Sequence, residues 1–317
     1  MLQLFLLCYQ FLPKIRNRSG ETIAMRRYEW PILLFCGAIF LSPVNDAIVK
    51  LVTVEMSIAE VICIRALFCA CILLCIKNNV KELTRTEIDA LFLLVCRATL
   101  LSMSMFLYIY SLSFLALSIA VSIFYLAPVF ISLLSPVFLR EPMRLNNIIF
   151  VLIGFFGVLL ISEPWSADPK AEVLLVVIAA LSYAFFQLLT RATSSKAGTL
   201  TVVTVQHLAL SIISGIVILY NFSVTHHGSD FSRIIKNYSF ENLMLIFICG
   251  LIVLCFSFAS ANAYRKTYAF KIAPLEFVAI PSGVIWSYII WNDVPSVFAF
   301  GGIFIIFMVG LINSRLN

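Results

Sequence analysis

The residues with the clearest chemical potential are charged and amide side chains placed inside long apolar runs. Asn45 and Asp46 lie in the first run, Arg65 lies in the second, and Glu276 opens a run near the C-terminus. Because burying a charge in hydrocarbon is costly, such residues usually face a partner, a water-filled cavity or a transported solute. Together they could hold a zwitterion. The carboxylates would attract an amino or other cationic group, and the guanidinium would clamp a carboxylate.

Other polar and aromatic side chains in the apolar runs are expected to share one cavity with these charges. Tyr108, Tyr125 and Trp286 could stack on a planar base, and Gln187 and His207 bring hydrogen-bonding groups. The predicted substrate-binding residues are Asp46, Arg65, Glu276, Asn45, Tyr108, Tyr125, Gln187, His207 and Trp286. The alternative for each is a structural role in an interhelical hydrogen bond, a closing ion pair or the core.

Composition determines which elements must position these residues. Hydrophobic residues make up 62% of the 317-residue chain and charged residues 12%, and the mean hydropathy is +1.04. Too few polar residues remain to cover a soluble globule, so a soluble enzyme, a disordered chain and a secreted disulfide scaffold are excluded. The apolar runs are continuous rather than alternating, which favours helices over a membrane barrel. The sequence predicts an all-α integral membrane protein with about ten transmembrane helices, near 30–52, 58–76, 88–110, 116–139, 147–162, 171–190, 200–220, 243–263, 273–291 and 297–312.

The distribution of Lys and Arg predicts which ends of the spans face the cytoplasm. When the spans alternate from a cytoplasmic N-terminus, the inner connections carry most of the basic residues, as the positive-inside rule requires. Both termini are therefore expected on the cytoplasmic side of a bacterial inner membrane. Residues 1–24 run from apolar to basic, the reverse of a signal peptide, so the native start is expected at Met25. Arg97, near an inner end, is expected to extend toward the membrane surface, with a place in the cavity lining as the alternative.

Matching residues recur at a fixed spacing in the two halves of the chain. Three pairs lie 153 positions apart: Pro128 and Pro281, Pro142 and Pro295, and Gly157 and Gly310. A five-helix unit that is copied once inverts its direction in the membrane, a pattern typical of secondary transporters. We therefore expect a cytoplasmic extension at 1–29 and two inverted five-helix repeats at 30–163 and 171–313. Pro128 and Pro281 are expected to act as kinks or hinges.

The sequence lacks the motifs of catalysis and of ATP hydrolysis. It has no H-E-x-x-H, G-x-S-x-G or P-loop pattern. The nine cysteines lie in apolar runs without a C-x-x-C spacing, so they are expected to act as small hydrophobic residues. The net charge of +6 fits basic inner loops better than nucleic-acid binding. We expect no enzyme activity, no cofactor and no metal, with an ion gradient or substrate exchange as the energy source.

Two proline-containing stretches resemble a known family. Ala116–Pro142 reads ALSIAVSIFYLAPVFISLLSPVFLREP and Ala273–Pro295 reads APLEFVAIPSGVIWSYIIWNDVP, and each helix ends before an acidic residue, Glu141 or Asp293. They are similar to the fourth and ninth helices of the EamA-repeat branch of the drug/metabolite transporter superfamily. The resemblance implies ten helices in two inverted EamA-type halves, cytoplasmic termini and a central substrate cavity.

A second resemblance concerns the substrate. Asn45–Asp46 with Lys50, and Glu60 with Arg65, look like the branch that includes S-adenosylmethionine uptake transporters. The Ala273–Pro274 start of the ninth helix is similar too, whereas Glu276 and Pro281 depart from that branch. The predicted function is secondary transport of a small polar metabolite by alternating access, with S-adenosylmethionine uptake as the leading candidate. The expected partners are the lipid bilayer and a small-molecule substrate; proton or exchange-substrate coupling and a homodimer stay open. The alternatives are an exporter of amino acids or cationic drugs, and a non-transporting membrane scaffold or lipid enzyme.

Overall fold

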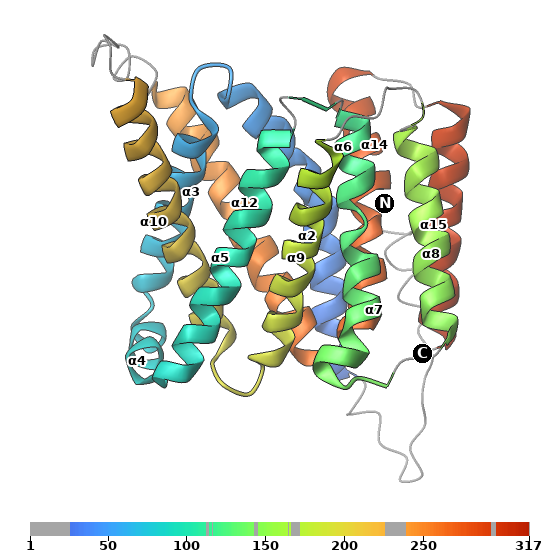
Figure 1. Cartoon of the computed structure of the whole chain (residues 1–317), viewed down its shortest axis with the longest axis horizontal. Helices are drawn as coiled ribbons and strands as arrows, with labels where there is room; N and C mark the ends of the chain where they lie inside the picture. Colours follow the sequence, from blue (N-terminus) through green and yellow to red (C-terminus); the bar gives the residue numbers. More distant parts are fainter. Residues whose placement is uncertain are drawn as a thin grey trace.

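The computed structural model describes residues 26–111, 114–115, 117–142, 145–163, 165, 172–225, 239–292 and 296–316. Within these ranges every regular element is helical, and the helices stand side by side as one bundle (Figure 1). Residues 1–24 with the expected start at Met25, and Asp293 and Pro295 of the second proline motif, lie outside the described part.

The helices follow the predicted apolar runs closely. The first half contains α2 (Arg26–Val52), α3 (Ile58–Leu74), α4 (Lys77–Arg85), α5 (Ile88–Ser111), α6 (Leu117–Phe124), α7 (Ala127–Leu139) and α8 (Leu145–Ser162). The second half contains α9 (Val173–Ala192), α10 (Thr199–Thr225), α12 (Phe240–Lys266), α13 (Ala269–Ile272), the 3₁₀ helix η2 (Ala273–Val278), α14 (Ala279–Trp291) and α15 (Val297–Leu316).

The described part contains seven spans that are long and apolar enough to cross a membrane, or eight if α3 and α4 count as one bent span. Two further apolar stretches, 147–161 in α8 and 297–309 in α15, are shorter. The chain is therefore an all-α membrane protein, and the count of ten spans stays a prediction.

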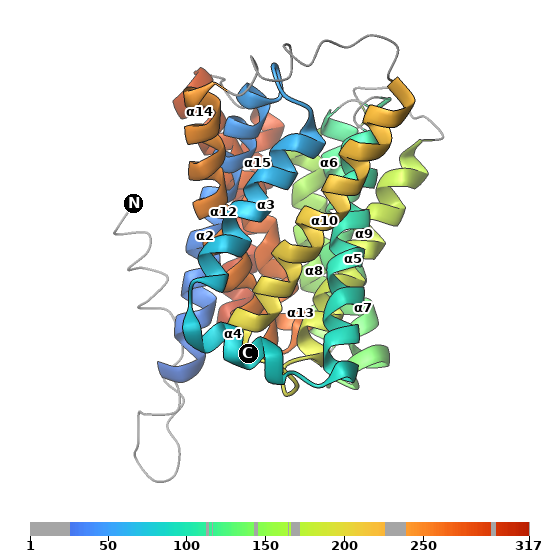
Figure 2. The ribbon, with the colours of Figure 1, turned by 90° about the vertical axis from the view of Figure 1, so that its left-hand side faces the viewer.

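Helix α4 was not predicted as an element of its own. Its sequence, KNNVKELTR, is polar, and it bends by 98° from α3 to lie across one end of the bundle (Figure 2). The Asn79 Nδ2 donates to the Leu73 carbonyl at 2.9 Å and to the Thr204 Oγ1 at 2.7 Å, which fixes α4 against α10.

The main helix contacts are symmetric between the two halves. Helix α2 packs on α12 as α5 packs on α9, while α3 packs on α10 and α8 packs on α15. The counterparts in the two halves are α2 and α9, α3 and α10, α5 and α12, and α8 and α15. When each of these helices is replaced by its counterpart, the same pairs of helices are in contact. Helices α2 and α9 also run in opposite directions (Figure 1). This packing is what two inverted five-helix units would produce, and the boundaries 30–163 and 171–313 remain predictions.

Both proline-containing spans are interrupted. The chain breaks between α6 and α7 at Tyr125–Leu126, and η2 precedes α14. Pro128 is the second residue of α7, where a missing amide costs little, whereas Pro281 is the third residue of α14. Each helix ends at a left-handed residue, Arg140 (φ 53°) and Asn292 (φ 56°). These ends are 152 positions apart, so the two prolines, 153 apart, do not occupy equivalent helix positions. Their predicted hinge role stays a prediction.

Helices α8 and α15 approach closely at Gly157 and Gly302. A Cβ added at Gly302 would overlap the Gly157 carbonyl oxygen, whereas a Cβ at the neighbouring Gly301 would meet nothing within 4 Å. We expect Gly302→Leu to force the helices apart at a cost of about 1–3 kcal/mol. A thermal melt of the purified protein in detergent should show a lower midpoint than for wild type. Gly301→Leu is the matched control, and equal midpoints for the two variants would contradict the close contact.

Candidate functional site

Asn45 connects the two opposite charges that the sequence analysis placed in the first two spans. The Arg65 Nη1 donates to the Asn45 Oδ1 at 3.2 Å, and the Asn45 Nδ2 donates to the Asp46 Oδ1 at 3.0 Å. Arg65 and Asn45 are buried, and the ion pair that the described residues form lies elsewhere, between Arg191 and Glu141. The guanidinium and the carboxylate are thus held near each other but not paired directly. Neither charge is neutralised by an ion pair with a described residue.

The Asp46 side chain is exposed although it faces other helices of the bundle. It lies about two turns after the buried Ile39, on the same face of α2. Its charge acts on Arg65, on Tyr108 of α5 and on Tyr125 in the break between α6 and α7. Both tyrosines are partly exposed. The Asp46 carboxylate is accessible to solvent in the space that Arg65, Tyr108 and Tyr125 border. We call this space the Asp46 hollow, and it is the candidate site.

Glu276 has a different environment, since its carboxylate is already hydrogen-bonded. Its Oε1 accepts from the Tyr264 hydroxyl at 2.6 Å, the Tyr183 hydroxyl at 3.3 Å and the Gln187 Nε2 at 3.4 Å. Gln187 also donates to the Tyr183 hydroxyl at 2.8 Å and to the Ser260 Oγ at 3.3 Å. The structure thus brings the predicted residues Glu276 and Gln187 together. Their role in substrate binding stays a prediction.

Tyr183 and Tyr264 were missed by the sequence analysis. They are aromatic residues in apolar helices, where the usual interpretation is packing, and nothing in the sequence indicates that both hydroxyls converge on one carboxylate. Tyr264 is fully buried and Tyr183 is partly exposed. The partner that makes them informative, Glu276, lies on η2 rather than on their own helices.

Arg97 and His207 lie in the interior of the bundle. The Arg97 Nε donates to the Thr190 Oγ1 at 2.5 Å and its Nη2 to the Gln206 Oε1 at 2.9 Å, while its guanidinium carbon lies 4.2 Å from the centre of the Phe186 ring. The side chain is 1% exposed, so the prediction that Arg97 extends to the membrane surface is wrong. Neutral oxygens and an aromatic face receive the charge inside the bundle. His207 is also 1% exposed, and its predicted role in substrate binding stays a prediction.

The Trp286 indole donates a hydrogen bond to a carbonyl on α2. Pro43 has no amide hydrogen, so the Ile39 carbonyl loses its helical partner, and the Ser42 hydroxyl donates to it at 2.8 Å. The Trp286 Nε1 donates to the next carbonyl, that of Phe40, at 2.8 Å. Trp286 therefore joins α14 to α2 through its indole nitrogen, and its predicted stacking on a substrate base stays a prediction.

Glu60 has a structural use. The Ser57 amide donates to the Glu60 Oε2 at 2.8 Å, and the Glu60 amide donates to the Ser57 Oγ at 3.3 Å. This is a capping box that starts α3. It explains an acid near the end of an apolar run without invoking a substrate.

A group of polar contacts joins several helices at the end of the bundle opposite the Asp46 hollow. The Glu141 Oε1 accepts from the Arg191 Nε at 3.0 Å and its Oε2 from the Ala269 amide at 2.9 Å, while the Arg191 Nη1 donates to the Arg265 carbonyl at 2.7 Å. We call Glu141, Arg191, Arg265 and Ala269 the clamp. It joins the ends of α7, α9 and α12 to the start of α13. Burial raises the pKa of Glu141, and the Arg191 hydrogen bond opposes that rise.

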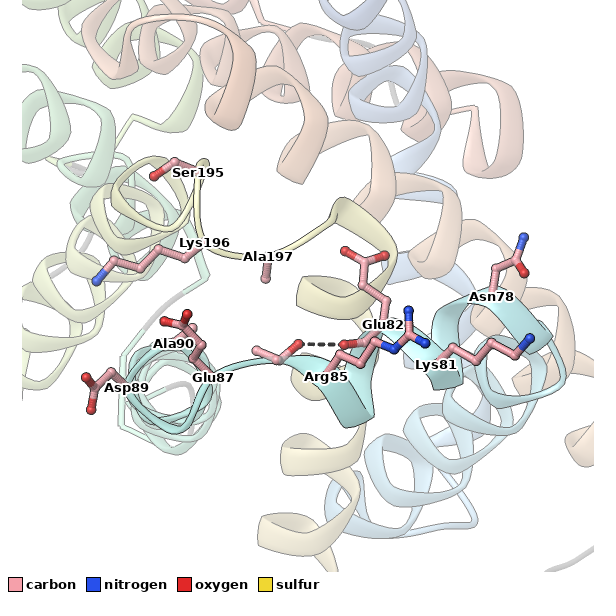
Figure 3. Close-up of a pocket in the computed structure, with 11 residues that line it drawn as sticks. Asn78, Lys81, Glu82, Arg85, Glu87, Asp89, Ala90, Ser195, Lys196 and Ala197 are labelled. Carbon is pink, nitrogen blue, oxygen red and sulfur yellow. Dashed lines mark hydrogen bonds between the residues drawn. The ribbon is translucent and has the colours of Figure 1, made fainter.

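A separate surface hollow of about 640 Å³ lies beside α4, where α5 begins and the α9–α10 turn passes (Figure 3). Its charged lining residues are Lys81, Glu82, Arg85, Glu87, Asp89 and Lys196. It is about 27 Å along α5 from Tyr108, at the rise of a regular helix. Because basic and acidic side chains are mixed in its exposed lining, it resembles a solvated surface rather than a substrate site.

Comparisons with known proteins agree on the class of the chain. The sequence model of the EamA-like transporter family matches residues 29–163. An S-adenosylmethionine uptake transporter of Rickettsia conorii is 24% identical over 277 residues, which cover 86% of this chain and 88% of the relative. A riboflavin transporter of Vibrio cholerae is 24% identical over 169 residues, 53% of each chain. A solved structure described only as "Crystal structure of protein" superposes with a TM-score of 0.71 at 14% identity, over 91% of this chain and 97% of that chain. The last comparison shows a shared fold.

Proposed function

We propose that this multi-pass membrane transporter, whose residues 29–163 match the model of the EamA-like transporter family, takes up S-adenosylmethionine. The observation that carries the proposal is the unpaired placement of Asp46 and Arg65 on either side of Asn45. Two opposite charges held apart by a neutral bridge fit a solute that has both a cationic and an anionic group. The relatives named for S-adenosylmethionine uptake, similar over most of the chain, support the same substrate.

The chemistry of S-adenosylmethionine fits the residues around the Asp46 hollow. Its sulfonium and ammonium groups are cations that Asp46 would attract, and its carboxylate suits the planar guanidinium of Arg65. Its adenine is a flat base that Tyr108 or Tyr125 could stack on. Riboflavin, the substrate named for another relative, has a flat ring but no such pair of charges. It would leave Asp46 and Arg65 without partners, and it therefore serves as a competitor in the test.

We further propose that the described conformation is closed toward the cytoplasm. Asp46 lies about 9 Å along α2 from Val52, where α2 ends. That end of the bundle is away from the basic connections. The clamp joins the helices at the opposite end, where the basic connections lie. With the predicted orientation in a bacterial inner membrane, the hollow would face outside and the clamp inside. Alternating access would then require the Glu141–Arg191 contact to break.

Uptake of radiolabelled S-adenosylmethionine into bacteria that express the protein tests the proposed function. We expect saturable uptake that unlabelled S-adenosylmethionine and S-adenosylhomocysteine inhibit and that riboflavin and a panel of amino acids do not. Absence of uptake at verified membrane abundance would contradict the substrate. If cationic drugs or amino acids inhibited the uptake of label and unlabelled S-adenosylmethionine did not, the exporter alternative would be favoured.

A further inference from the structure

Glu276 is poorly placed to bind a substrate cation, yet it is an acid in the interior of a membrane protein. Its Oε1 already accepts three hydrogen bonds, from Tyr264, Tyr183 and Gln187. The residue is 9% exposed and lies on η2, at the interruption of a span. An intramembrane carboxylate in such a position calls for a function other than helix packing.

All three donors to Glu276 are uncharged. In the described ranges the recorded ion pair is Arg191 with Glu141, and no Lys or Arg nitrogen lies within 4.0 Å of the Glu276 carboxylate. The titratable groups that face it are Tyr183 from α9, Tyr264 from α12 and Tyr125 from the α6–α7 break. The residues beside Glu276 in the chain pack into apolar clusters. Ala273 and Leu275 lie with Phe35, Ile39 and Ile131, and Phe277 lies with Val129, Val151, Val158, Ile280 and Ile306. A carboxylate without a cation in such surroundings gains by binding a proton.

The second carboxylate oxygen is not fully buried. Oε2 accepts no hydrogen bond from a described residue, and it is not among the buried polar atoms that lack a partner, so part of its surface is accessible. Tyr125, partly exposed, is within electrostatic reach of both Asp46 and Glu276. Tyr125 therefore lies near both the Asp46 hollow and the Glu276 carboxylate.

We propose that Glu276 is a proton-binding site that couples solute movement to the proton gradient. One proton from external water binds Oε2 in the outward-open state, and the same proton leaves to cytoplasmic water after the clamp opens. The ionised carboxylate holds the hydroxyls of Tyr183 and Tyr264, and so ties α9 and α12 to η2. Neutralisation weakens both contacts and frees the interrupted span to move. Ala269, which Glu141 holds in the clamp, begins the same interrupted span.

The transport test uses purified protein in proteoliposomes and rests on S-adenosylmethionine being a substrate. With one proton per solute, an inward gradient of one pH unit should raise steady-state accumulation about tenfold in wild type. Glu276→Gln, which is neutral at every pH, should lose this stimulation and keep the exchange of internal for external solute. Glu60→Gln is the matched control, since glutamine also completes a capping box, and it should respond to the gradient like wild type. A gradient response retained in Glu276→Gln, or missing in wild type that exchanges S-adenosylmethionine, would overturn the proposal.

A second readout does not depend on the substrate. Infrared difference spectra between acidic and alkaline buffer should show a carboxylic-acid C=O band in the purified protein that Glu276→Gln lacks. Tyr264→Phe keeps the acid but removes the 2.6 Å hydrogen bond to it, and the band should move to higher wavenumber. An unchanged band in both variants would show that Glu276 is not the proton-binding site, whether or not S-adenosylmethionine is transported. A wild type that shows the band but takes up no S-adenosylmethionine would refute only the proposed substrate.

Discussion

Replacement of Arg65 by glutamine is expected to weaken S-adenosylmethionine uptake about 30-fold or more at unchanged membrane abundance. The guanidinium is buried, and removing one partner of a desolvated charge pair costs about 2 kcal/mol or more, where 1.4 kcal/mol is tenfold. A glutamine amide can still donate to Asn45, so the bridge to Asp46 is kept. The concentration dependence of the initial uptake rate measures the effect, with Glu60→Gln as the control that should behave like wild type.

Substrate selectivity tests whether Asp46 binds the cationic group of the substrate and Arg65 binds its carboxylate. Wild type should prefer S-adenosylmethionine to its decarboxylated analogue, and Arg65→Gln should lose that preference because the carboxylate no longer has a partner. Asp46→Asn should instead lose the preference over S-adenosylhomocysteine, which lacks the sulfonium charge. If either variant lost affinity equally for all three compounds, the assignment of Asp46 to the cation and Arg65 to the carboxylate would be wrong.

Truncation of Glu141 to alanine is expected to loosen the clamp and shift the protein away from the described conformation. The change leaves the Ala269 amide and the Arg191 Nε without their acceptor. An orphaned buried donor costs about 1–3 kcal/mol, which corresponds to a shift of about 5- to 150-fold in a two-state equilibrium. Amide hydrogen exchange of the purified protein should therefore become faster in the segment 265–272.

The control for the clamp is an acid at the same end of the bundle. Glu87 is exposed at the start of α5, so Glu87→Ala removes an equal charge without touching the clamp. It should leave exchange in 265–272 at the wild-type rate. Equal exchange in Glu141→Ala and wild type would mean that these contacts do not hold the end of the bundle closed.

The spans and part of the site could be predicted because their signals are local. Continuous apolar runs mark the helices, and Asn45, Asp46 and Arg65 stand out because each is polar where the neighbours are not. Glu60 stands out in the same way, but Ser57 lies three positions before it, and that spacing is a capping-box signature. Reading that local motif would have removed Glu60 from the polar residues in need of a cavity.

The remaining features depend on contacts between residues far apart in the sequence. Arg97 was expected at the membrane surface because its depth in the span allowed it, but its acceptors come from Thr190 on α9 and Gln206 on α10. The hydroxyls of Tyr183 and Tyr264 meet at Glu276 only because η2 interrupts its span there. No periodicity within one helix encodes which neutral group on another helix it will face.

Solute counterflow with purified protein tests the central claim most directly, because it needs neither an energy source nor cellular metabolism. Proteoliposomes loaded with unlabelled S-adenosylmethionine are diluted into a trace of labelled compound. We predict transient accumulation of label in vesicles containing wild type and little in vesicles containing Asp46→Asn. Label in wild-type vesicles no higher than in protein-free vesicles, with the protein folded and correctly inserted, would contradict the account of this chain as an S-adenosylmethionine transporter.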